Sequence, residues 1–461
     1  MDAWASAGEV AAAVVEGRAS AVAVAEAALA LIDERNPILN AFTATTRERA
    51  LAKAGAVDTD RAAGKALGPL AGVPYAVKNL FDVAGQATLA GSKINRGRSA
   101  AARDATLIRR LDAAGAVLLG ALNMGEYAYD FTGENVHCGP SRNPHDTTRM
   151  TGGSSGGTGG AVAGGLVPFA LGSDTNGSIR VPSSFCGLFG LKPTYGRLSR
   201  AGTFPFVASL DHTGPMARST RDLALAYDAM QGHDPEDPVC ADRRAEPVLP
   251  ELTRDIGGLR IAVAGGYFES GALPEAMIAV ARVASALDAT RGIEIPEAAR
   301  ARAAASVISA TEGAALHLDR LRTRAADFDP TVRDRLFAGA CVPASFVVKA
   351  QKFRRWYSEQ VLKLFENVDA IVAPATPFSA PRIGQQTIML EGAEVSLRPQ
   401  IGIFTQPISF IGLPVVTVPV PLSPLPIGVQ IIAPPWREDI ALQIAYALEE
   451  MKVAAAPRPA G

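Results

Sequence analysis

Three short segments of this 461-residue sequence hold side chains that could attack a substrate or move a proton. The segment TGGSSGGTGG, residues 151–160, places Ser154 and Ser155 among six glycines and carries no charge. A second segment of small residues, GSDTNGSIRVPSSF at 172–185, contains Ser178. The third, VPYAVKNLF, holds Lys78 as a lone cation among apolar neighbours. Serine hydroxyls can act as nucleophiles and a neutral lysine amine as a base, so the three segments point to covalent catalysis.

The glycine–serine segment is ambiguous when it is considered alone. A P-loop needs a lysine at the end of its glycine run, and residues 151–160 contain none. A nucleophile elbow or a dinucleotide-binding loop follows a strand, and the preceding RNPHDTTRM is polar and broken by proline, so we expect no strand there. The last histidine, His317, lies in an expected helix. A glycine-rich turn that lets two backbones pack closely remains the structural alternative.

Lys78 has two interpretations. It could extend along apolar surface with its ammonium in water. It could instead be buried and neutral, which requires a pKa lowered by roughly 3 units, about 4–5 kcal/mol, and desolvation can supply that. Near Asn176 and Gly177, successive backbone N–H groups could converge on one oxygen, as in an oxyanion hole. Two serines and a lysine without a useful histidine fit a Ser–Ser–Lys relay.

The three segments together resemble the amidase signature family, whose hallmark is a lysine, then G-G-S-S-G-G, then D-T-x-G-S-I-R. The matching positions are Lys78, residues 152–157 and residues 174–180, and the similarity extends over roughly residues 5–450. The resemblance implies that Ser178 is the acylated nucleophile, that Ser154 bridges it to Lys78 after a cis peptide bond, and that Lys78 is the base. It further implies an oxyanion hole from four backbone N–H groups, those of Thr175, Asn176, Gly177 and Ser178.

The same resemblance assigns supporting roles. Ser155, Asp174 and Arg180 are expected to hold the loop through hydrogen bonds. Asn176 departs from the family pattern, which has glycine more often, so its side chain is expected to reach the substrate pocket. No metal and no organic cofactor is required by this mechanism, and the five histidines of the chain have no metal-ligand spacing.

The substrate is less closely defined. Several segments, among them TLAGSKINR and KAQKFRRWY, resemble the branch that deaminates 1-carboxybiuret in cyanuric acid breakdown. Alternatives are a glutaminase component of an amidotransferase and an amidase for another ureide or an oxamate-like amide. The glutaminase branch has an acidic residue where this chain has Gly402. An anionic substrate needs a cation, for which Arg335 is the first candidate, although it could be a surface arginine, with Tyr129 and Arg322 as further ones.

Partners and location follow from the branch and from composition. The resemblance implies a homodimeric core and a small helical accessory subunit. The net charge of −1 gives no basic surface for nucleic acid, and no uncharged run is free enough of glycine and proline to span a membrane. Four well-separated cysteines suit free thiols in the cytoplasm. A catalytically silent scaffold on the same fold is a further hypothesis, which an intact lysine and serine set disfavours.

Alternating helix and strand patterns predict an α/β fold, and the resemblance specifies the amidase signature fold. We expect one large mixed sheet covered by helices on both faces in a single large domain. Residues 1–60 are expected to form a helical segment on the core or on a partner, with Ser20 as an N-cap. Residues 61–452 are expected to form the catalytic domain, mainly helical at 274–366, and residues 453–461 a tail.

Overall fold

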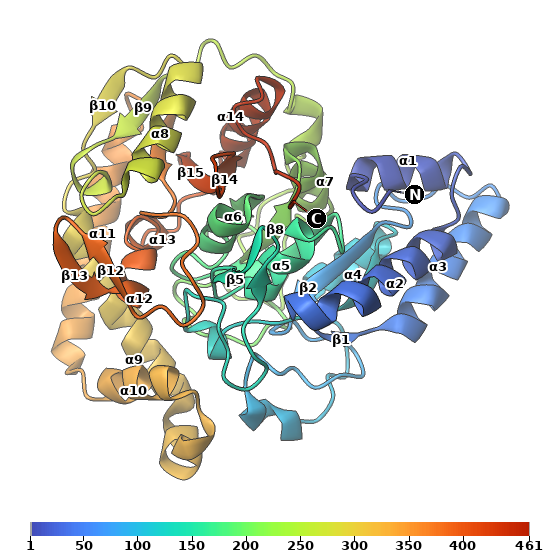
Figure 1. Ribbon diagram of the computed structural model, residues 1–461, viewed down its shortest axis with the longest axis horizontal. Coiled ribbons are helices and arrows are strands. Elements are labelled where there is room, and N and C mark those ends of the chain that lie inside the picture. The colour runs from blue at the N-terminus through green and yellow to red at the C-terminus, as the bar shows by residue number, and fades with distance from the viewer. Residues whose placement is uncertain (1, 461) are drawn as a thin grey trace.

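A mixed sheet of 11 strands forms the centre of the protein, in a computed structural model that describes residues 2–460 (Figure 1). From one edge to the other the strands are β1 (Phe42–Thr45), β3 (Val117–Leu122), β2 (Pro74–Lys78), β6 (Phe169–Asp174), β8 (His212–Ala217), β7 (Phe189–Lys192), β14 (Val415–Val420), β15 (Ile427–Ile432), β11 (Ala370–Pro374), β9 (Ile261–Ala264) and β10 (Arg291–Ile293). The central strands are apolar and buried on both faces, as expected for a sheet covered on both sides.

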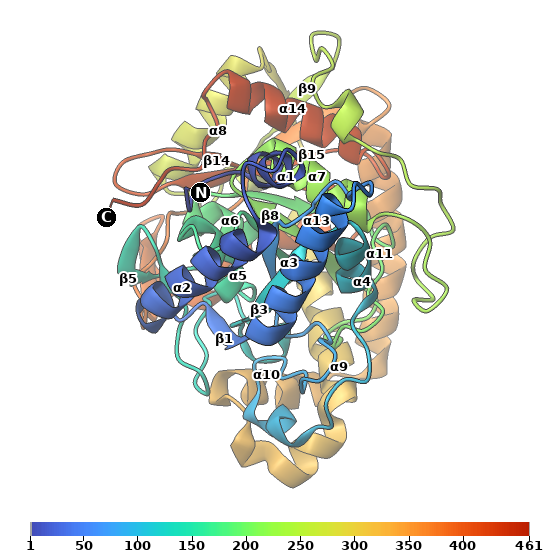
Figure 2. The ribbon, with the colours of Figure 1, turned by 90° about the vertical axis from the view of Figure 1, so that its right-hand side faces the viewer.

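Helices cover both faces of this sheet, which confirms the predicted α/β class and single-domain architecture. Figure 2 shows α5 and α6 on one side and α4 and α7 on the other. The helices are α1 (Ala7–Val15), α2 (Ala21–Leu39), α3 (Arg47–Ala62), α4 (Thr106–Ala113), α5 (Gly156–Ala163), α6 (Arg180–Cys186), α7 (Thr220–Met230), α8 (Pro274–Ala286), α9 (Ala298–Arg324), α10 (Pro330–Ala340), α11 (Ala344–Leu364), α12 (Leu397–Ile401), α13 (Gln406–Ser409) and α14 (Glu438–Glu450). Short 3-10 turns are η1 (Lys93–Gly97), η2 (Glu126–Ala128), η3 (Leu249–Glu251), η4 (Gly266–Phe268) and η5 (Ala325–Asp327).

Local signals in the sequence account for several of these elements. Ser20 accepts a hydrogen bond from the Ala23 N–H and so caps α2, as predicted. That helix ends where Asn40 adopts a left-handed conformation, with φ of 48°. Helix α9 packs against both α10 and α11, and α9 and α10 lie at one end of the molecule (Figure 1). α9 and α10 approach closely at Gly339, where a Cβ would lie 2.1 Å from the Ala310 carbonyl oxygen.

One expectation about the glycine–serine segment is wrong. Residues before it do form a strand, β5 (Asp146–Met150), which pairs with β4 (Arg142–Asn143). Polar residues and Pro144 misled the prediction because this two-stranded sheet is partly exposed and separate from the main sheet. The strand is therefore not the buried strand that a nucleophile elbow needs, and the rejection of that motif stands.

The central strand β2 lies between β3 and β6 and runs parallel to both. Parallel strands end at the same edge of a sheet, so Lys78, the last residue of β2, emerges beside Ser173 and Asp174 at the end of β6. Two further strands, β12 (Thr387–Leu390) and β13 (Ala393–Ser396), form a separate hairpin. A small apolar cluster anchors this hairpin region beside the glycine–serine segment; its buried members include Met150, Phe185, Phe378, Leu390 and Leu397.

Candidate active site

Lys78 is fully buried at the end of β2 and is surrounded by hydroxyl groups. Its Nζ donates hydrogen bonds to the Oγ atoms of Ser154 at 2.7 Å, Ser155 at 3.0 Å and Ser173 at 2.9 Å. Within residues 2–460 it forms no ion pair. Burial lowers the pKa of Lys78 to about 7, because desolvation disfavours the ammonium form. The amine can therefore be neutral at physiological pH, which is what a proton acceptor requires.

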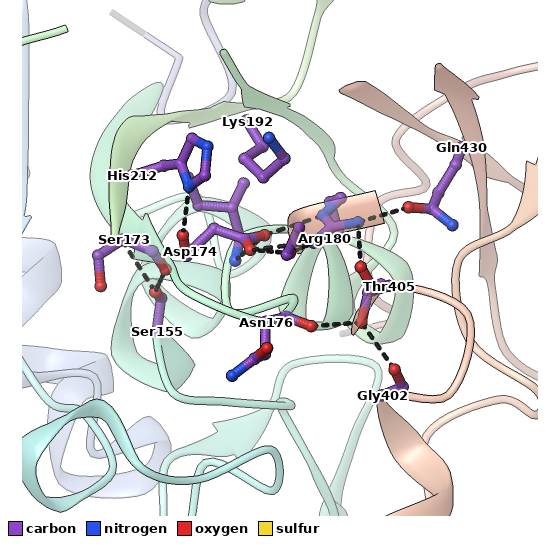
Figure 3. A network of polar contacts seen from close by, with 12 residues as sticks. Ser155, Ser173, Asp174, Asn176, Arg180, Lys192, His212, Gly402, Thr405 and Gln430 are labelled. Atoms are coloured by element: carbon purple, nitrogen blue, oxygen red, sulfur yellow. Dashed lines mark hydrogen bonds and ion pairs between the residues drawn. The ribbon is translucent and has the colours of Figure 1, made fainter. Parts of the chain in front are cut away.

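The glycine–serine segment brings Ser154 and Ser155 to Lys78 because it is pressed against other backbone. A Cβ at Gly153 would lie 2.7 Å from the Gly133 amide nitrogen, and one at Gly157 would lie 2.4 Å from the Ala41 carbonyl oxygen. The peptide bond between Gly153 and Ser154 is cis, as predicted. Ser155 Oγ also donates to the Ser173 carbonyl at 3.2 Å, which fastens the segment to β6 (Figure 3).

Ser178 lies in the loop between β6 and α6, and this loop has free hydrogen-bond donors. Among the hydrogen bonds of the described chain, none is donated by the backbone N–H groups of residues 175–178. Thr405 Oγ1 donates to the Asn176 carbonyl at 2.7 Å. The Gly177 N–H belongs to the same trans peptide group and therefore points away from Thr405. A Cβ at Gly177 would lie 2.3 Å from Thr405 Oγ1, which explains the glycine.

A buried ion pair holds the Ser178 loop in place. Arg180 donates to both Asp174 carboxylate oxygens, at 2.9 and 3.0 Å, and both side chains are fully buried (Figure 3). Burial alone would raise the pKa of Asp174, but the Arg180 guanidinium outweighs it and holds that pKa well below its usual range. Arg180 also donates to the Thr405 carbonyl at 3.0 Å and to Gln430 Oε1 at 2.7 Å. These contacts agree with the loop-holding role expected of Asp174 and Arg180.

A cavity of about 560 Å³ opens at Ser178. Part of its wall is formed by Thr175, Asn176 and Ser178. Another part is formed by the aromatic rings of Tyr129 and Phe206, which pack against each other with their centroids 4.7 Å apart. The Asn176 side chain lines this cavity, as predicted, and its Nδ2 donates to Ser309 Oγ at 2.9 Å. The volume of the cavity suits a small molecule.

Three arginines line the same cavity, and only one of them is neutralised. Arg398 pairs with Asp130 at 3.0 Å and Glu134 at 2.8 Å. Arg302 and Arg335 form no ion pair with any described residue. The Arg335 guanidinium lies 4.0 Å from the centre of the Tyr129 ring and donates to the Thr331 carbonyl at 2.9 Å. Burial lowers the pKa of Arg335. Two cations without counter-ions favour an anionic ligand.

Some of these residues were predicted from the sequence and others were not. Tyr129 and Arg335 do line the cavity, but Arg322 does not, because its side chain is exposed and lies 3.7 Å from Asp319. Arg302, Ser306 and Ser309 were not singled out. Their spacing of four and three residues puts them on one face of α9, and this polar stripe is the signal that could have found them.

No three His, Cys, Asp or Glu side chains within residues 2–460 gather closely enough to hold a metal ion. No helix in this part of the chain combines the length and the apolar character that crossing a bilayer requires.

The sequence profile of the Amidase family matches residues 23–442, so the chain belongs to the amidase family. It is an enzyme of the class that hydrolyses C–N bonds other than peptide bonds. It is 54% identical to AtzE, the 1-carboxybiuret hydrolase component of Pseudomonas sp. strain ADP, over 96% of this chain and 97% of that protein. It is 38% identical to the A-type component of the glutamyl-tRNA(Gln) amidotransferase of Azotobacter vinelandii, over 94% of each chain.

Solved structures give the same result. A structure described as a vestigial protein complex that reveals the evolutionary origins of an s-triazine catabolic enzyme superposes with a TM-score of 0.97, at 53% identity over 98% of this chain and all of that one. The substrate complex of 6-aminohexanoate cyclic dimer hydrolase superposes with a TM-score of 0.89, at 32% identity over 100% of this chain and 99% of the other. Both likenesses confirm the predicted amidase signature fold.

Proposed function

We propose that this amidase removes the terminal amide nitrogen of a small carboxylated ureide as ammonia, with 1-carboxybiuret as its substrate. The observation that carries the proposal is the pair of arginines without counter-ions, Arg302 and Arg335, in the cavity that Ser178 lines. A substrate carboxylate would neutralise one of these two cations. The 54% identity to a carboxybiuret hydrolase supports the same substrate.

The proposed chemistry uses the three residues of the Ser–Ser–Lys relay. Ser178 Oγ bonds to the carbonyl carbon while its proton passes to Ser154, and the Ser154 proton passes to the neutral Lys78 amine. The N–H groups of residues 175–178 stabilise the oxyanion. The C–N bond then breaks, the relay returns the proton to the nitrogen, and ammonia leaves. Water attacks the acyl-enzyme and releases Ser178, so the product carries a new carbamate. No step uses a cofactor.

A glutaminase is the alternative, given the amidotransferase components among the relatives. Glutamine carries an ammonium group, for which that branch places an acidic residue. Here the matching position is Gly402, and a Cβ there would lie 2.5 Å from the Phe131 ring. Asp130 also lines the cavity, but its carboxylate already accepts hydrogen bonds from Arg398, Thr132 and Gly133. An ammonium group would therefore find no free carboxylate on these two positions, which favours the ureide.

The proposal includes the organisation and location of the protein. Residues 1–60 would form a helical segment on the core or on a partner, 61–452 the catalytic domain with its helical subregion at 274–366, and 453–461 a tail. A homodimeric core and a small helical accessory subunit would complete the assembly, and the enzyme would act in the cytoplasm. The solved relative described as a protein complex supports the accessory subunit.

Ammonia release from carboxybiuret, biuret and glutamine tests the proposed function. We expect turnover of carboxybiuret, weaker turnover of its uncharged counterpart biuret, and none of glutamine. Ser178→Ala should abolish ammonia release, and Ser154→Ala should lower kcat by orders of magnitude. Turnover of glutamine in place of carboxybiuret would overturn the substrate assignment, and an active Ser178→Ala variant would overturn the mechanism.

A further inference from the structure

We infer that Arg302 and Gln406 form a second oxygen-binding subsite, at which Gln406 donates a hydrogen bond to a substrate oxygen other than that of the scissile carbonyl. The inference rests on the proposed function, because it concerns how the same cavity selects its amide. It makes Gln406 a specificity-determining residue. The wall on which Gln406 lies offers hydrogen-bond donors, whereas an amide that bears an ammonium group needs acceptors.

The orientation of the Gln406 amide is fixed by its neighbour. Arg302 Nε lies 3.2 Å from Gln406 Oε1. A guanidinium has donors only, so the atom that faces it must be the amide oxygen and not the nitrogen. Arg302 is itself held, because its Nη2 donates to the Pro399 carbonyl at 2.6 Å. The two donor hydrogens of Gln406 Nε2 therefore point away from Arg302.

Gln406 Nε2 is left for a ligand. The Gln406 side chain is 8% exposed and lines the cavity together with Ser178. Gln406 Nε2 donates no hydrogen bond to any described residue. The fully buried polar atoms without a partner in the described chain do not include Nε2, so this atom is not sealed inside the protein. It is therefore open to the cavity. An enclosed amide donor without an acceptor costs free energy, and a ligand oxygen that accepts from it would remove this cost.

The donors of this subsite define the ligand group. Arg302 supplies a positive charge without a counter-ion, and Gln406 Nε2 supplies a neutral donor. Both suit a carbonyl or carboxylate oxygen and both repel an ammonium group. A carboxylated ureide has oxygen acceptors on successive carbons beside the scissile carbonyl. Arg335, on a different helix, remains available for one of them, so one substrate could meet both cations.

Gln406→Glu tests the subsite because it keeps the shape of the side chain and reverses the hydrogen-bonding polarity of its free end. The new carboxylate would pair with Arg302, so the fold should be kept and the melting temperature unchanged or raised. We expect KM for carboxybiuret to rise about 10- to 100-fold with kcat changed less than about threefold. Gln360→Glu, the same change on α11 outside the cavity lining, should leave both constants unchanged.

Binding to a Ser178→Ala background separates this inference from the proposed function. Calorimetric Kd values for biuret, which keeps a second carbonyl oxygen, are compared with and without Gln406→Glu, and the substitution should weaken binding about 10-fold or more. Equal Kd values, or an unchanged KM in the active enzyme, overturn the subsite and leave the proposed function standing. Failure of the wild-type enzyme to release ammonia from carboxybiuret and biuret overturns the proposed function. Absence of biuret binding with and without Gln406→Glu, while carboxybiuret is still turned over, overturns the subsite alone.

Discussion

Lys78 Nζ and Ser154 Oγ lie 2.7 Å apart inside the protein, although 76 positions separate the two residues in the sequence. The contact depends on the end of β2, which carries Lys78, and on a turn whose glycines lie too close to neighbouring atoms to be replaced by larger residues. It makes the protonation state of Lys78 the quantity that controls the relay, and the first two predictions concern that state.

Lys78→Met should abolish turnover without destabilising the fold. Below about pH 7 the wild-type protein carries a buried ammonium, whereas the same lysine in the unfolded chain has a pKa near 10.5. The depressed pKa therefore costs stability, on the order of 4–5 kcal/mol, fully below about pH 7 and not at all above about pH 10.5. The melting temperature of Lys78→Met relative to wild type should increase as the pH falls from 10 to 7 and stay constant below. A variant uniformly less stable than wild type would contradict this.

The pH dependence of kcat/KM should follow the free amine. In the proposed relay the neutral form of Lys78 is the base, so kcat/KM should rise with pH through a midpoint near 7 and then level off. Burial also lowers the pKa of Lys192 to about 7, but its Nζ donates to backbone carbonyls of Pro193 and Leu413. Lys192→Gln should therefore leave the midpoint unchanged. A midpoint that shifts in Lys192→Gln would show that Lys192, and not Lys78, controls the pH dependence.

Arg335→Gln should weaken the binding of anions more than that of neutral amides. The guanidinium has no counter-ion among the described residues and lines the cavity, so its loss should raise KM for carboxybiuret about 10- to 100-fold. KM for biuret should change by less than about threefold. Arg322→Gln is the matched control, since Arg322 is exposed on α9 and outside the cavity lining. Steady-state kinetics on both substrates decides, and equal losses for the two would remove the carboxylate contact.

Arg180→Gln should destabilise the protein by about 3–5 kcal/mol, because it leaves the Asp174 carboxylate buried without its partner. Urea unfolding measures the loss. The double variant Asp174→Asn with Arg180→Gln removes both charges and should be more stable than the single variant. If the double variant loses more than the single one, the destabilisation comes from packing and not from the unpaired charge.

The sequence pointed to the candidate catalytic residues more directly than to the cavity around them. Lys78, Ser154 and Ser178 occupy short segments with rare compositions, and a cluster of this kind can be recognised before its geometry is known. For Arg302 the only sequence signal is the polar stripe of α9, and Gln406 has no such signal, because it lies 104 residues further along the chain. Their role depends on how α9 packs against α13, which only the tertiary structure reveals.

The fold shows the same division between local and long-range information. Alternating patterns of helix and strand predicted the α/β class, and a local signal predicted the cap of α2 at Ser20. Strand β5 was missed because its residues are polar and partly exposed. It is held by pairing with β4 and by an isolated backbone β-bridge between Arg149 and Arg382. Burial of a strand can be inferred from composition, but pairing with a distant segment cannot.

The hydrogen bond from Arg180 to Gln430 Oε1 spans 250 positions of the chain. A ribosome that has translated the first 400 residues has already made Lys78, Ser154 and Ser178, yet the Thr405 carbonyl and Gln430 that hold Arg180 do not exist at that stage. The nascent chain therefore contains every reactive side chain before it contains the groups that position them. Amide hydrolysis should begin only when residues 405–430 have left the exit tunnel, and a fragment that ends before Thr405 should not be an enzyme.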